Sequence, residues 1–320
     1  MLLIQRKKIP GRNSIEKVFE PLSSRYPSLE LPCELTGLKS LIKIYIFLLR
    51  NVNEKFIHVT GHVHYVCFLL FWKKSILTIH DLHYYENAVG FKKKIYGFIW
   101  FWLPIRAANA ITVISPATKE QLHKNFKIGT VPVLVIPNYV HNRPSFKRRM
   151  KNMDVFNILV IGTASNKNLE NIILSLGNLS NYKVTIVGKL NNNIKIYLKE
   201  MGISYQNVFD ISEEALSKLY AMSDTLLFPS LREGFGMPII EAQAAGLPVI
   251  TSNIDPMSYV AGDAAILVNP LDTDQITKAL KSLVNNDDLR EDLIKKGYIN
   301  IKRFSQDRFI SAFEKLYKLL

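Results

Sequence analysis

The segment Thr225–Thr251 reads TLLFPSLREGFGMPIIEAQAAGLPVIT, in which a glycine-containing loop separates two short apolar runs. The first run ends at Phe228 and the second spans Pro248–Thr251, and each predicts a buried strand. Between them, Pro238 suits the first position of a helix, where a missing N–H costs nothing, and Gly246 suits a left-handed cap at its end. The segment therefore predicts a strand, a glycine loop, a helix and a second strand.

The glycine loop of this segment suits a ligand that carries hydroxyl groups. Gly234 and Gly236 allow the backbone to approach a ligand, and the free N–H groups at a helix N-terminus favour anions and hydroxyls. Glu233 lies in the loop, and Glu241 follows Pro238 by about one helical turn. Two carboxylates there could accept hydrogen bonds from a sugar and a ribose. The alternative for a bare Glu-Gly pair is an ordinary solvated glutamate.

The string EGFGMPIIEAQAAGLPVI at residues 233–250 resembles the signature of retaining GT-B glycosyltransferases of the group 1 family, which is family 4 in the sequence classification. The resemblance covers most of residues 55–285 and is sharpest at 205–270. It implies that Glu233 and the loop residues Gly234, Phe235 and Gly236 hold the donor sugar. It also implies that Glu241 binds the ribose of the nucleotide.

Apolar runs alternate with helical patterns along both halves of the chain, which predicts an α/β fold with parallel sheets covered on both faces. The resemblance implies the GT-B architecture: two doubly wound Rossmann-like domains facing a cleft, with the C-terminal helix crossing back to the first domain. Ligands are expected at the carboxyl ends of the strands. The predicted strands are Leu2–Gln5, Phe56–Thr60, Ile76–Ile79, Ala110–Ile114, Val133–Ile136, Phe156–Ile161, Lys183–Val187, Val208–Ile211, Leu226–Phe228, Pro248–Thr251 and Ala265–Val268.

Three ranges follow for the domains. We expect an acceptor-binding domain at residues 1–145, a nucleotide-sugar-binding domain at 153–303 and a crossing helix at 304–320, with a polar, charged linker at His141–Asn152. Helical patterns in the first half include Leu38–Leu49 and Phe91–Ala108, the second of which Pro104 is expected to kink.

The loop after the first strand of the second domain suits a phosphate. Gly162, Thr163 and Lys167 lie where a helix begins, so amide donors, a helix dipole and a mobile cation come together. The alternative is a capped helix with an exposed lysine. The resemblance implies that Lys167 contacts the donor diphosphate. Many family members carry Arg where this chain has Thr163, so either Thr163 donates a weaker hydrogen bond or a second cation, with Arg232 as a candidate, replaces it.

His80 and Asp81 follow an apolar strand of the first half, where function tends to lie in this architecture. A histidine there could equally be structural. The resemblance implies that His80 approaches the donor sugar or the reacting centre, and Asp81 could orient its ring or bind an acceptor hydroxyl. The predicted catalytic set is His80, Asp81 and Glu233. Because retaining GT-B reactions are thought to proceed by front-face substitution, we expect positioning and electrostatics rather than a base.

Gly11, Arg12, His62 and His64 are the predicted acceptor-binding residues. On a strand, His62 and His64 would share a face and could begin a metal site, but no third ligand is spaced to join them. The D-x-D string at Asp272–Asp274 precedes an amphipathic helix, so we interpret it as a helix cap. We expect no metal and no cofactor, and a nucleotide diphosphate sugar as the donor substrate.

The net charge of +14 belongs to the first half of the chain. Residues 1–150 hold 23 Lys and Arg against 8 Asp and Glu, together with all three tryptophans, while residues 151–320 hold 18 against 19. A basic, aromatic half indicates an anionic membrane surface or a polyanion, or simply lysines that favour solubility. The segments Lys39–Arg50 and Lys92–Trp102 could lie in a bilayer interface or be core helices with basic outer faces.

Two cysteines form neither a disulfide framework nor a metal spacing, which fits a reducing compartment. The first residues are too short an apolar run for a signal peptide, and we expect no transmembrane helix. The predicted location is cytoplasmic, peripheral on the inner face of the plasma membrane.

The leading hypothesis is a retaining, metal-independent hexosyltransferase that moves a sugar from a nucleotide diphosphate sugar to a glycan or lipid-linked acceptor in cell-envelope polysaccharide synthesis. The alternatives are a GT-B sugar-nucleotide epimerase and a non-catalytic basic protein that binds a membrane or a polyanion. No nucleic-acid motif accompanies the basic half, so nucleic acid is not an expected partner.

Overall fold

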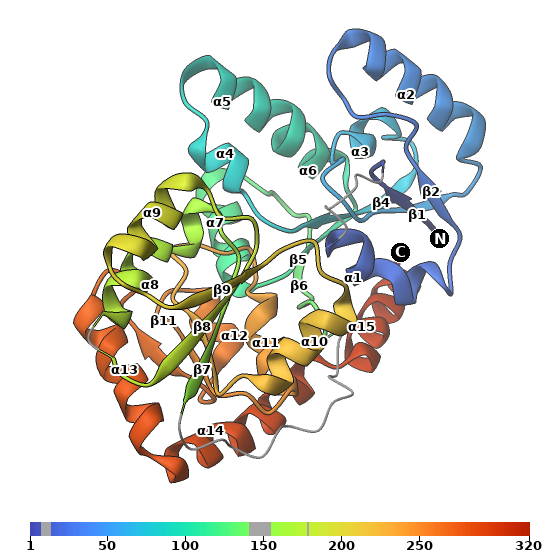
Figure 1. The fold of residues 1–320 in the computed structure, drawn as a ribbon. Coiled ribbons are helices and arrows are strands. Elements are labelled where there is room, and N and C mark those ends of the chain that lie inside the picture. Colours follow the sequence, from blue (N-terminus) through green and yellow to red (C-terminus); the bar gives the residue numbers. More distant parts are fainter. Residues whose placement is uncertain (8–13, 141–154, 178) are drawn as a thin grey trace. The chain divides into compact units, whose positions relative to one another are not determined.

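The computed structural model describes residues 1–7, 14–140, 155–177 and 179–320 of the chain. Its contacts divide the chain into two units, drawn in Figure 1. The first unit combines Met1–Tyr139 with Gln306–Leu320, and the second is Val140–Ser305. The predicted linker at His141–Asn152 and the predicted acceptor residues Gly11 and Arg12 lie outside the described residues.

The first unit contains a 6-stranded parallel sheet in the order β2-β1-β3-β4-β5-β6. Every strand except β2 was predicted. That strand is three residues long, lies at the edge of the sheet and has no apolar run to reveal it. The strands are β1 (Leu2–Gln5), β2 (Ser28–Glu30), β3 (Phe56–Val59), β4 (Lys74–Ile79), β5 (Ala110–Val113) and β6 (Val133–Val135).

The helices of the first unit include one from the far end of the chain. They are α1 (Ser14–Ser23), α2 (Leu38–Asn51), α3 (Val66–Leu69), α4 (His83–Asn87), α5 (Gly90–Gly97), the π-helical turn η1 (Phe98–Trp102), α6 (Leu103–Ala107), α7 (Pro116–Asn125) and α15 (Gln306–Leu319).

Successive side chains along each strand point to opposite faces of the sheet, and both faces of this sheet are apolar. Ile4 and Leu77 belong to a buried cluster to which α2, α3 and α6 contribute. Their neighbours Leu3 and Ile76 belong to a second cluster, to which α1 and α15 contribute. Both faces of the sheet are therefore buried, as expected for parallel strands.

His58 on β3 ties α15 to the first sheet. Its Nδ1 lies 2.6 Å from the Tyr317 hydroxyl, and its Nε2 lies 2.7 Å from the Thr78 hydroxyl. Burial lowers the pKa of His58 to about 3, so the ring is neutral at pH 7 and forms a hydrogen bond on each side. The sequence did not reveal this role, because the partner on α15 is 259 residues away along the chain.

The helix predicted over Phe91–Ala108 forms, but Pro104 changes its winding. A π-helical turn, η1, joins α5 to α6 immediately before the proline. Because Pro104 has no N–H, it cannot donate to the Trp100 carbonyl four residues earlier. His64 donates to that carbonyl oxygen instead, from Nδ1 at 2.8 Å.

The second unit contains another 6-stranded parallel sheet, in the order β12-β11-β10-β7-β8-β9. Its strands are β7 (Phe156–Ile161), β8 (Tyr182–Val187), β9 (Tyr205–Val208), β10 (Thr225–Phe228), β11 (Val249–Ser252) and β12 (Ile266–Val268). Its helices are η2 (Ser165–Lys167), α8 (Leu169–Leu176), α9 (Asn192–Glu200), α10 (Glu213–Met222), α11 (Met237–Ala244), α12 (Met257–Ala261), α13 (Thr273–Asn285), α14 (Asp287–Asn300) and η3 (Ile301–Phe304).

Two local predictions in the second unit can be checked. The strand expected at Val208–Ile211 was wrong by about one strand length, because β9 ends at Val208 and Asp210 adopts a positive φ of 56°. The expected helix cap was right, since the Asp272 carboxylate accepts a hydrogen bond from the Gln275 N–H at the start of α13.

Each sheet has one point at which its strand order reverses. In the second unit, β7 lies between β8 and β10, so the chain leaves β7 toward one edge and returns to its other side at β10. In the first unit, β1 lies between β2 and β3. The loops that follow these central strands diverge at the carboxyl edge, which is where open α/β sheets bind ligands.

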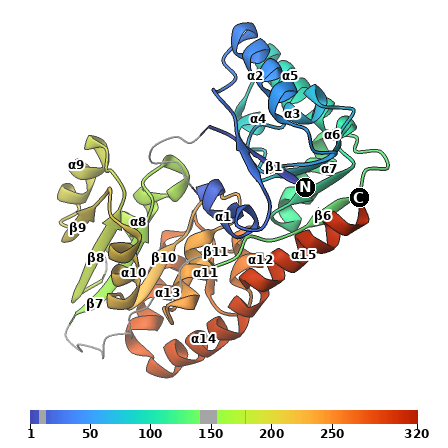
Figure 2. The ribbon, with the colours of Figure 1, turned by 90° about the vertical axis from the view of Figure 1, so that its right-hand side faces the viewer.

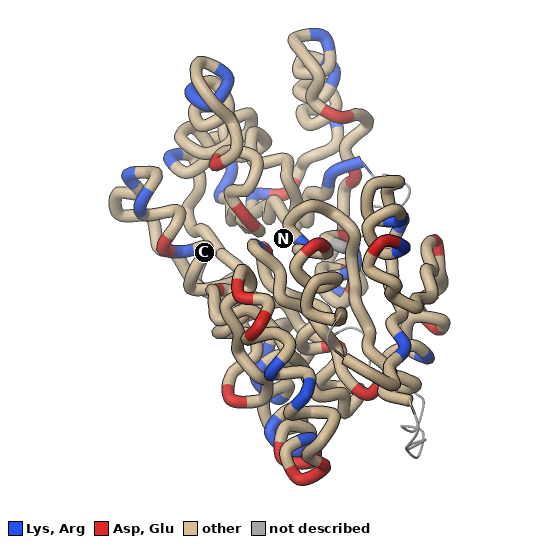
Figure 3. Tube along the Cα trace, turned by 60° about the vertical axis from the view of Figure 1, so that its left-hand side comes forward, with Lys and Arg blue, Asp and Glu red and all other residues tan. Residues whose placement is uncertain are grey.

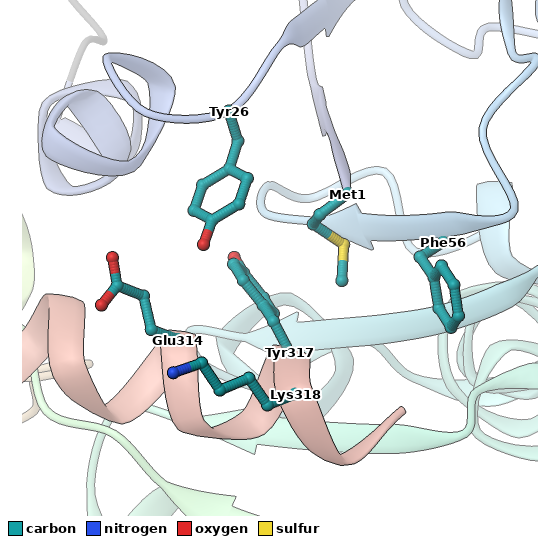
Figure 4. A pocket seen from close by; sticks show the side chains of 6 residues that line it. All are labelled: Met1, Tyr26, Phe56, Glu314, Tyr317 and Lys318. Atoms are coloured by element: carbon teal, nitrogen blue, oxygen red, sulfur yellow. The ribbon is translucent and has the colours of Figure 1, made fainter.

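A hollow of about 450 Å³ lies at the opposite, amino end of the first sheet. Figure 4 shows the rings of Tyr26 and Tyr317 close together beside it, and their centroids are 5.1 Å apart. Its lining residues are Met1, Tyr26, Phe56, Glu314, Tyr317 and Lys318. No residue of the predicted site lies among them.

Candidate functional site

The loop after β7 is built around a close approach between Gly162 and Lys167. Gly162 has a φ of +96°, and a Cβ added to it would lie 2.6 Å from Cε of Lys167. A side chain at position 162 would therefore strain the backbone and displace the lysine. The glycine lets the lysine side chain pass over the loop.

Lys167 and Glu233 form an ion pair at the switch point of the second sheet. The Lys167 Nζ lies 2.6 Å from the Glu233 Oε1, and the two side chains are only 17% and 13% exposed. The ammonium group also lies 4.5 Å from the centroid of the Phe228 ring at the end of β10. An ammonium group has three N–H donors, so Lys167 retains donors for a second anion while it holds the carboxylate.

Asn166 fastens the same two loops together. Its side-chain amide donates to the Arg232 backbone carbonyl at 2.8 Å and to the Glu233 carboxylate at 3.4 Å. The backbone carbonyl of Asn166 accepts from the Leu231 N–H at 2.8 Å. The loops after β7 and β10, which are 66 residues apart at the Lys167–Glu233 pair, therefore form one structure. No feature of the sequence pointed to Asn166.

Thr163 holds the loop after β7 against the loop after β8. Its hydroxyl donates to the Lys189 carbonyl at 2.9 Å. Gly188 makes room for it, because a Cβ there would lie 2.8 Å from the Thr163 Cγ2. Lys189 is exposed and adjoins the position where many family members carry Arg. It joins Arg232 as a candidate for the second cation, and no motif in the sequence pointed to it.

A hollow of about 230 Å³ adjoins this loop within the second unit. It is lined by Thr163, Ala164, Ser165, Asn168, Leu169, Glu170, Asn191, Ile194 and Leu231. Hydroxyl, amide and carboxylate groups contribute to its lining, so it can accept a polar ligand.

Glu241 on α11 is held by a residue that the sequence did not point to. The Tyr220 hydroxyl on α10 donates to the Glu241 Oε2 at 2.7 Å. Burial and the neighbouring carboxylate raise the pKa of Tyr220 well above its ordinary value, so the phenol stays protonated and remains a donor. Glu241 itself is half-buried.

The start of α11 accounts for the remaining loop residues. Gly236 adopts a φ of +104° directly before the helix, and Pro238 lies in its first turn. Phe235 is buried, with its ring 5.7 Å from that of Phe304. Because its side chain packs into the core, a role toward a ligand falls to its backbone. Gly234 lies in the bend before it.

His80 lies at the carboxyl end of β4 and is almost completely buried. Its Nε2 donates to the Thr60 carbonyl at 2.8 Å, which leaves the lone pair on Nδ1. Burial, followed by the neighbouring His62, lowers the pKa of His80 to about 4. The ring is therefore neutral at pH 7.

Asp81 lies beside His62, whereas the His80 N–H donates its hydrogen bond to the Thr60 carbonyl. One Asp81 carboxylate oxygen accepts from the His83 N–H at 3.0 Å, and the other lies 3.9 Å from the His62 Nε2. Burial lowers the pKa of His62, although the Asp81 charge acts in the opposite direction. Our suggestion that Asp81 orients the His80 ring has no contact to support it.

His64 occupies the core of the first unit. Gly61–Tyr65 forms a turn that leads into α3, so the strand on which His62 and His64 would share a face does not exist. His64 is fully buried, and burial lowers its pKa to about 3. The structure thus places His64 away from the accessible position we predicted. Within the described ranges, no three His, Cys, Asp or Glu side chains are grouped to hold a metal ion.

Arg6 and Glu16 add an ion pair at the end of β1, beside the switch point of the first sheet. The Arg6 Nε lies 2.5 Å from a Glu16 carboxylate oxygen, and the side chains are 17% and 9% exposed. Burial acts to raise the pKa of Glu16, but the hydrogen bond and charge of Arg6 outweigh it and lower the pKa. No motif in the sequence pointed to this pair.

These two doubly wound parallel units define the class of the protein as GT-B. Residues 142–300 match the family model described as "Glycosyl transferases group 1". The matched segment, just under half of the chain, is similar to the group 1 glycosyl transferases.

Three similar proteins illustrate the match. The chain is 36% identical over 110 residues to O-antigen chain mannosyltransferase B of Escherichia coli, covering 34% of this chain and 29% of that protein. It is 25% identical over 243 residues to O-antigen chain mannosyltransferase RfbU of Salmonella typhimurium, covering 74% and 67%. The structure of HepE from Anabaena, in complex with UDP and glucose, superposes with a TM-score of 0.82 at 13% identity over 100% of both chains.

Proposed function

We propose that this protein is a retaining glycosyltransferase that moves a sugar from a nucleotide diphosphate sugar to a glycan or lipid-linked acceptor in cell-envelope polysaccharide synthesis. The observation that carries this proposal is the Lys167–Glu233 pair at the switch point of the second sheet. The names of the O-antigen relatives and the UDP and glucose bound to HepE support the substrate class.

In this proposal the second unit binds the donor. Lys167 holds the diphosphate with its remaining donors, and Thr163 assists with either Arg232 or Lys189 as the second cation. Glu233 accepts hydrogen bonds from the sugar, and Glu241, fixed by Tyr220, accepts them from the ribose. The backbone amides of Gly234, Phe235 and Gly236 lie directly before α11, where a helix N-terminus favours oxyanions. Within this proposal, binding of the diphosphate requires no metal.

The first unit supplies a neutral histidine and a carboxylate in this proposal. A neutral His80 cannot give up a proton at pH 7, so it acts by hydrogen bonding and position. In the front-face reaction the bond from the sugar to the leaving phosphate breaks while the bond to the acceptor oxygen forms on the same face. The proton of the acceptor hydroxyl passes to the leaving phosphate oxygen. His62 and Asp81, each about one-third exposed, are the proposed contacts for acceptor hydroxyls.

A panel of nucleotide sugars, scored first by thermal shift, tests the proposal. A donor present at 100 times its dissociation constant should stabilise the protein by about 2.7 kcal/mol. The bound donor is then incubated with acceptor glycans, and NMR of the product reads the anomeric configuration. Retained configuration supports the proposal, while inversion contradicts it.

The same NMR assay without an acceptor separates transfer from epimerisation. An epimerase converts the donor sugar with no acceptor present, and that result would replace our proposal. Lys167→Ala and Glu233→Gln should abolish donor stabilisation. Lys195→Ala, on an exposed position of α9 in the same unit, is the matched control and should retain it.

A further inference from the structure

Helix α2 exposes an apolar stripe that is separate from its buried face. Leu38, Ile42, Tyr45 and Leu49 follow the spacing i, i+4, i+7, i+11, and they are 72%, 49%, 37% and 49% exposed. At 100° per residue these side chains fall on one face of the helix. A different side of the helix, roughly 110° around its axis at 100° per residue, packs into the core of the first unit through Ile44 and Leu48. The helix is therefore apolar on two faces, only one of which the core needs.

The helix formed by α5 and η1 repeats the same pattern. Phe91, Ile95, Phe98 and Trp102 have the identical spacing and are 76%, 44%, 48% and 38% exposed. The rings of Phe98 and Trp102 stack on each other with centroids 4.9 Å apart. Two independent helices of one unit thus present matching exposed stripes.

Cations accompany both stripes, and carboxylates are absent from the same stretches of sequence. Lys39, Lys43 and Arg50 are exposed on α2. Lys92 and Lys94 are exposed on α5, and the Arg106 guanidinium lies 3.8 Å from the centroid of the Trp102 ring. No Asp or Glu occurs in the sequence at residues 35–53 or 87–119. The charge of this surface complements an anionic partner.

The two helices stand on the same side of the first unit. Figures 1 and 2, which differ by a quarter turn, both show α2 and α5 extending in the same direction from the sheet of that unit. Figure 3 shows Lys and Arg on both of them. A single flat partner could therefore reach both helices at once.

We propose that α2 and the α5–η1 helix form a two-helix surface that docks the protein on an anionic lipid bilayer. The apolar and aromatic stripes would enter the interface to headgroup depth, and the lysines and arginines would contact lipid phosphates. Aromatic side chains next to cations, without carboxylates, fit such an interface better than a protein partner, whose contact area usually has few lysines. Within the described part of the chain, no helix is long and apolar enough to cross a membrane, so contact through these helices would be peripheral.

This surface is a binding site and does not depend on the proposed transfer reaction. The test uses the full chain with sedimented vesicles of phosphatidylcholine, with and without about 30% phosphatidylglycerol. We expect binding to the anionic vesicles, weakened at high salt, and little binding to pure phosphatidylcholine. Equal binding to both, or none to either, would overturn the proposal. Transfer to a water-soluble acceptor is measured separately, so failure of one proposal does not imply failure of the other.

Two sets of variants assign the binding to this surface. Ile42→Ser combined with Phe98→Ser should reduce vesicle affinity about tenfold or more, because both stripes lose apolar area. Lys43→Ala combined with Lys92→Ala should reduce it by a similar factor. The matched control is Lys278→Ala combined with Lys281→Ala, which removes the same charge from exposed positions of α13 in the second unit. The control should bind like the parent.

Each alternative has its own outcome. If the α13 control loses as much affinity as the α2 and α5 variant, net charge rather than this surface binds the vesicles, and the proposal is wrong. If the serine variant keeps full vesicle affinity but turns a dimer into a monomer by light scattering, the stripes pair two copies of the chain, which also overturns it. Thermal unfolding of every variant verifies that the first unit remains folded.

Discussion

The carboxyl edges of the two sheets carry different sets of polar groups. At the switch point of the second sheet, Lys167 and Glu233 are fixed charges that neutralise each other. At the corresponding edge of the first sheet, burial lowers the pKa values of His62 and His80, so these rings are neutral at pH 7. The carboxyl edge of the second sheet suits a diphosphate, and that of the first sheet suits hydroxyl groups. The first sheet thus adds neutral ring nitrogens to the charged groups that its edge also carries, Asp81 and the Arg6–Glu16 pair.

The largest expected difference between the two units is in their stability to acid. His58 and His64, with pKa values of about 3, and His80, with about 4, are neutral in the folded first unit, whereas an unfolded histidine titrates near 6.5. As the pH falls below about 6.5, the unfolded state binds protons that the folded state does not, so stability decreases until the folded pKa is reached. At pH 5 each of these histidines should cost roughly 2 kcal/mol.

Calorimetry at pH 7 and pH 5 measures this effect. The second unit contains no histidine in residues 155–305, so its transition should move less than that of the first unit. Equal displacement of both transitions would contradict the neutral-histidine description of the first edge.

Lys167→Ala should produce the next largest effect. It removes the proposed diphosphate cation and leaves the mostly buried Glu233 without its ion-pair partner. Loss of one partner from a buried pair costs about 3 kcal/mol or more, and loss of a transition-state contact lowers kcat/KM by roughly 100-fold or more. Donor turnover and thermal unfolding are the measurements. Lys189→Ala should lower turnover by a smaller factor, and unchanged turnover there would leave Arg232 as the remaining candidate for the second cation.

Gly162→Ala should have an intermediate effect on stability and donor binding, and Gly202→Ala is its control. The new Cβ would meet the Lys167 side chain at 2.6 Å in a backbone with a φ of +96°. Gly202→Ala introduces a similar positive φ strain at +63°, but a Cβ there meets nothing within 4 Å. Both should lose about 1 kcal/mol of stability, and only the first should also weaken donor binding. Equal donor affinity in the two variants would show that the path of Lys167 over the glycine is unimportant.

Tyr220→Phe should have the smallest effect. It deletes one hydrogen bond to the Glu241 carboxylate, which is worth about 1.5 kcal/mol, or roughly tenfold in affinity. We expect a higher KM for the donor with kcat nearly unchanged, because Tyr220 acts by positioning Glu241. The control is Tyr182→Phe, at the first residue of β8. A fall in kcat at constant KM would contradict a positioning role.

The site residues at the carboxyl edge of the second sheet were more predictable from the sequence than those of the first sheet. Lys167, Glu233 and Glu241 lie in contiguous strings whose glycines, prolines and helix starts have direct backbone meanings. The strand–helix alternation predicted parallel sheets, whereas the strand order that brings the loops after β7 and β10 together comes from the structure. The α/β fold class was confirmed for the same reason.

Residues that act through long-range packing were not predictable. Tyr220 lies in an ordinary amphipathic helix, and only the packing of α10 beside α11 brings its hydroxyl to Glu241. Arg6 and Glu16 flank residues 8–13, and nothing in their spacing announces an ion pair. His64 was assigned to an acceptor-binding loop, but the turn at Gly61–Tyr65 directs its ring into the core, to the Trp100 carbonyl released by Pro104.

The position of α15 has a consequence for the order in which this protein is assembled. Phe309, Phe313 and Tyr317 complete the apolar layer and the His58 hydrogen bond of the first unit, yet they are translated after the entire second unit. On the ribosome, the amino-terminal unit must therefore wait for its last helix while the later unit can already close its own core. Folding of this chain should run against the direction of its synthesis, with the unit that is made first maturing last.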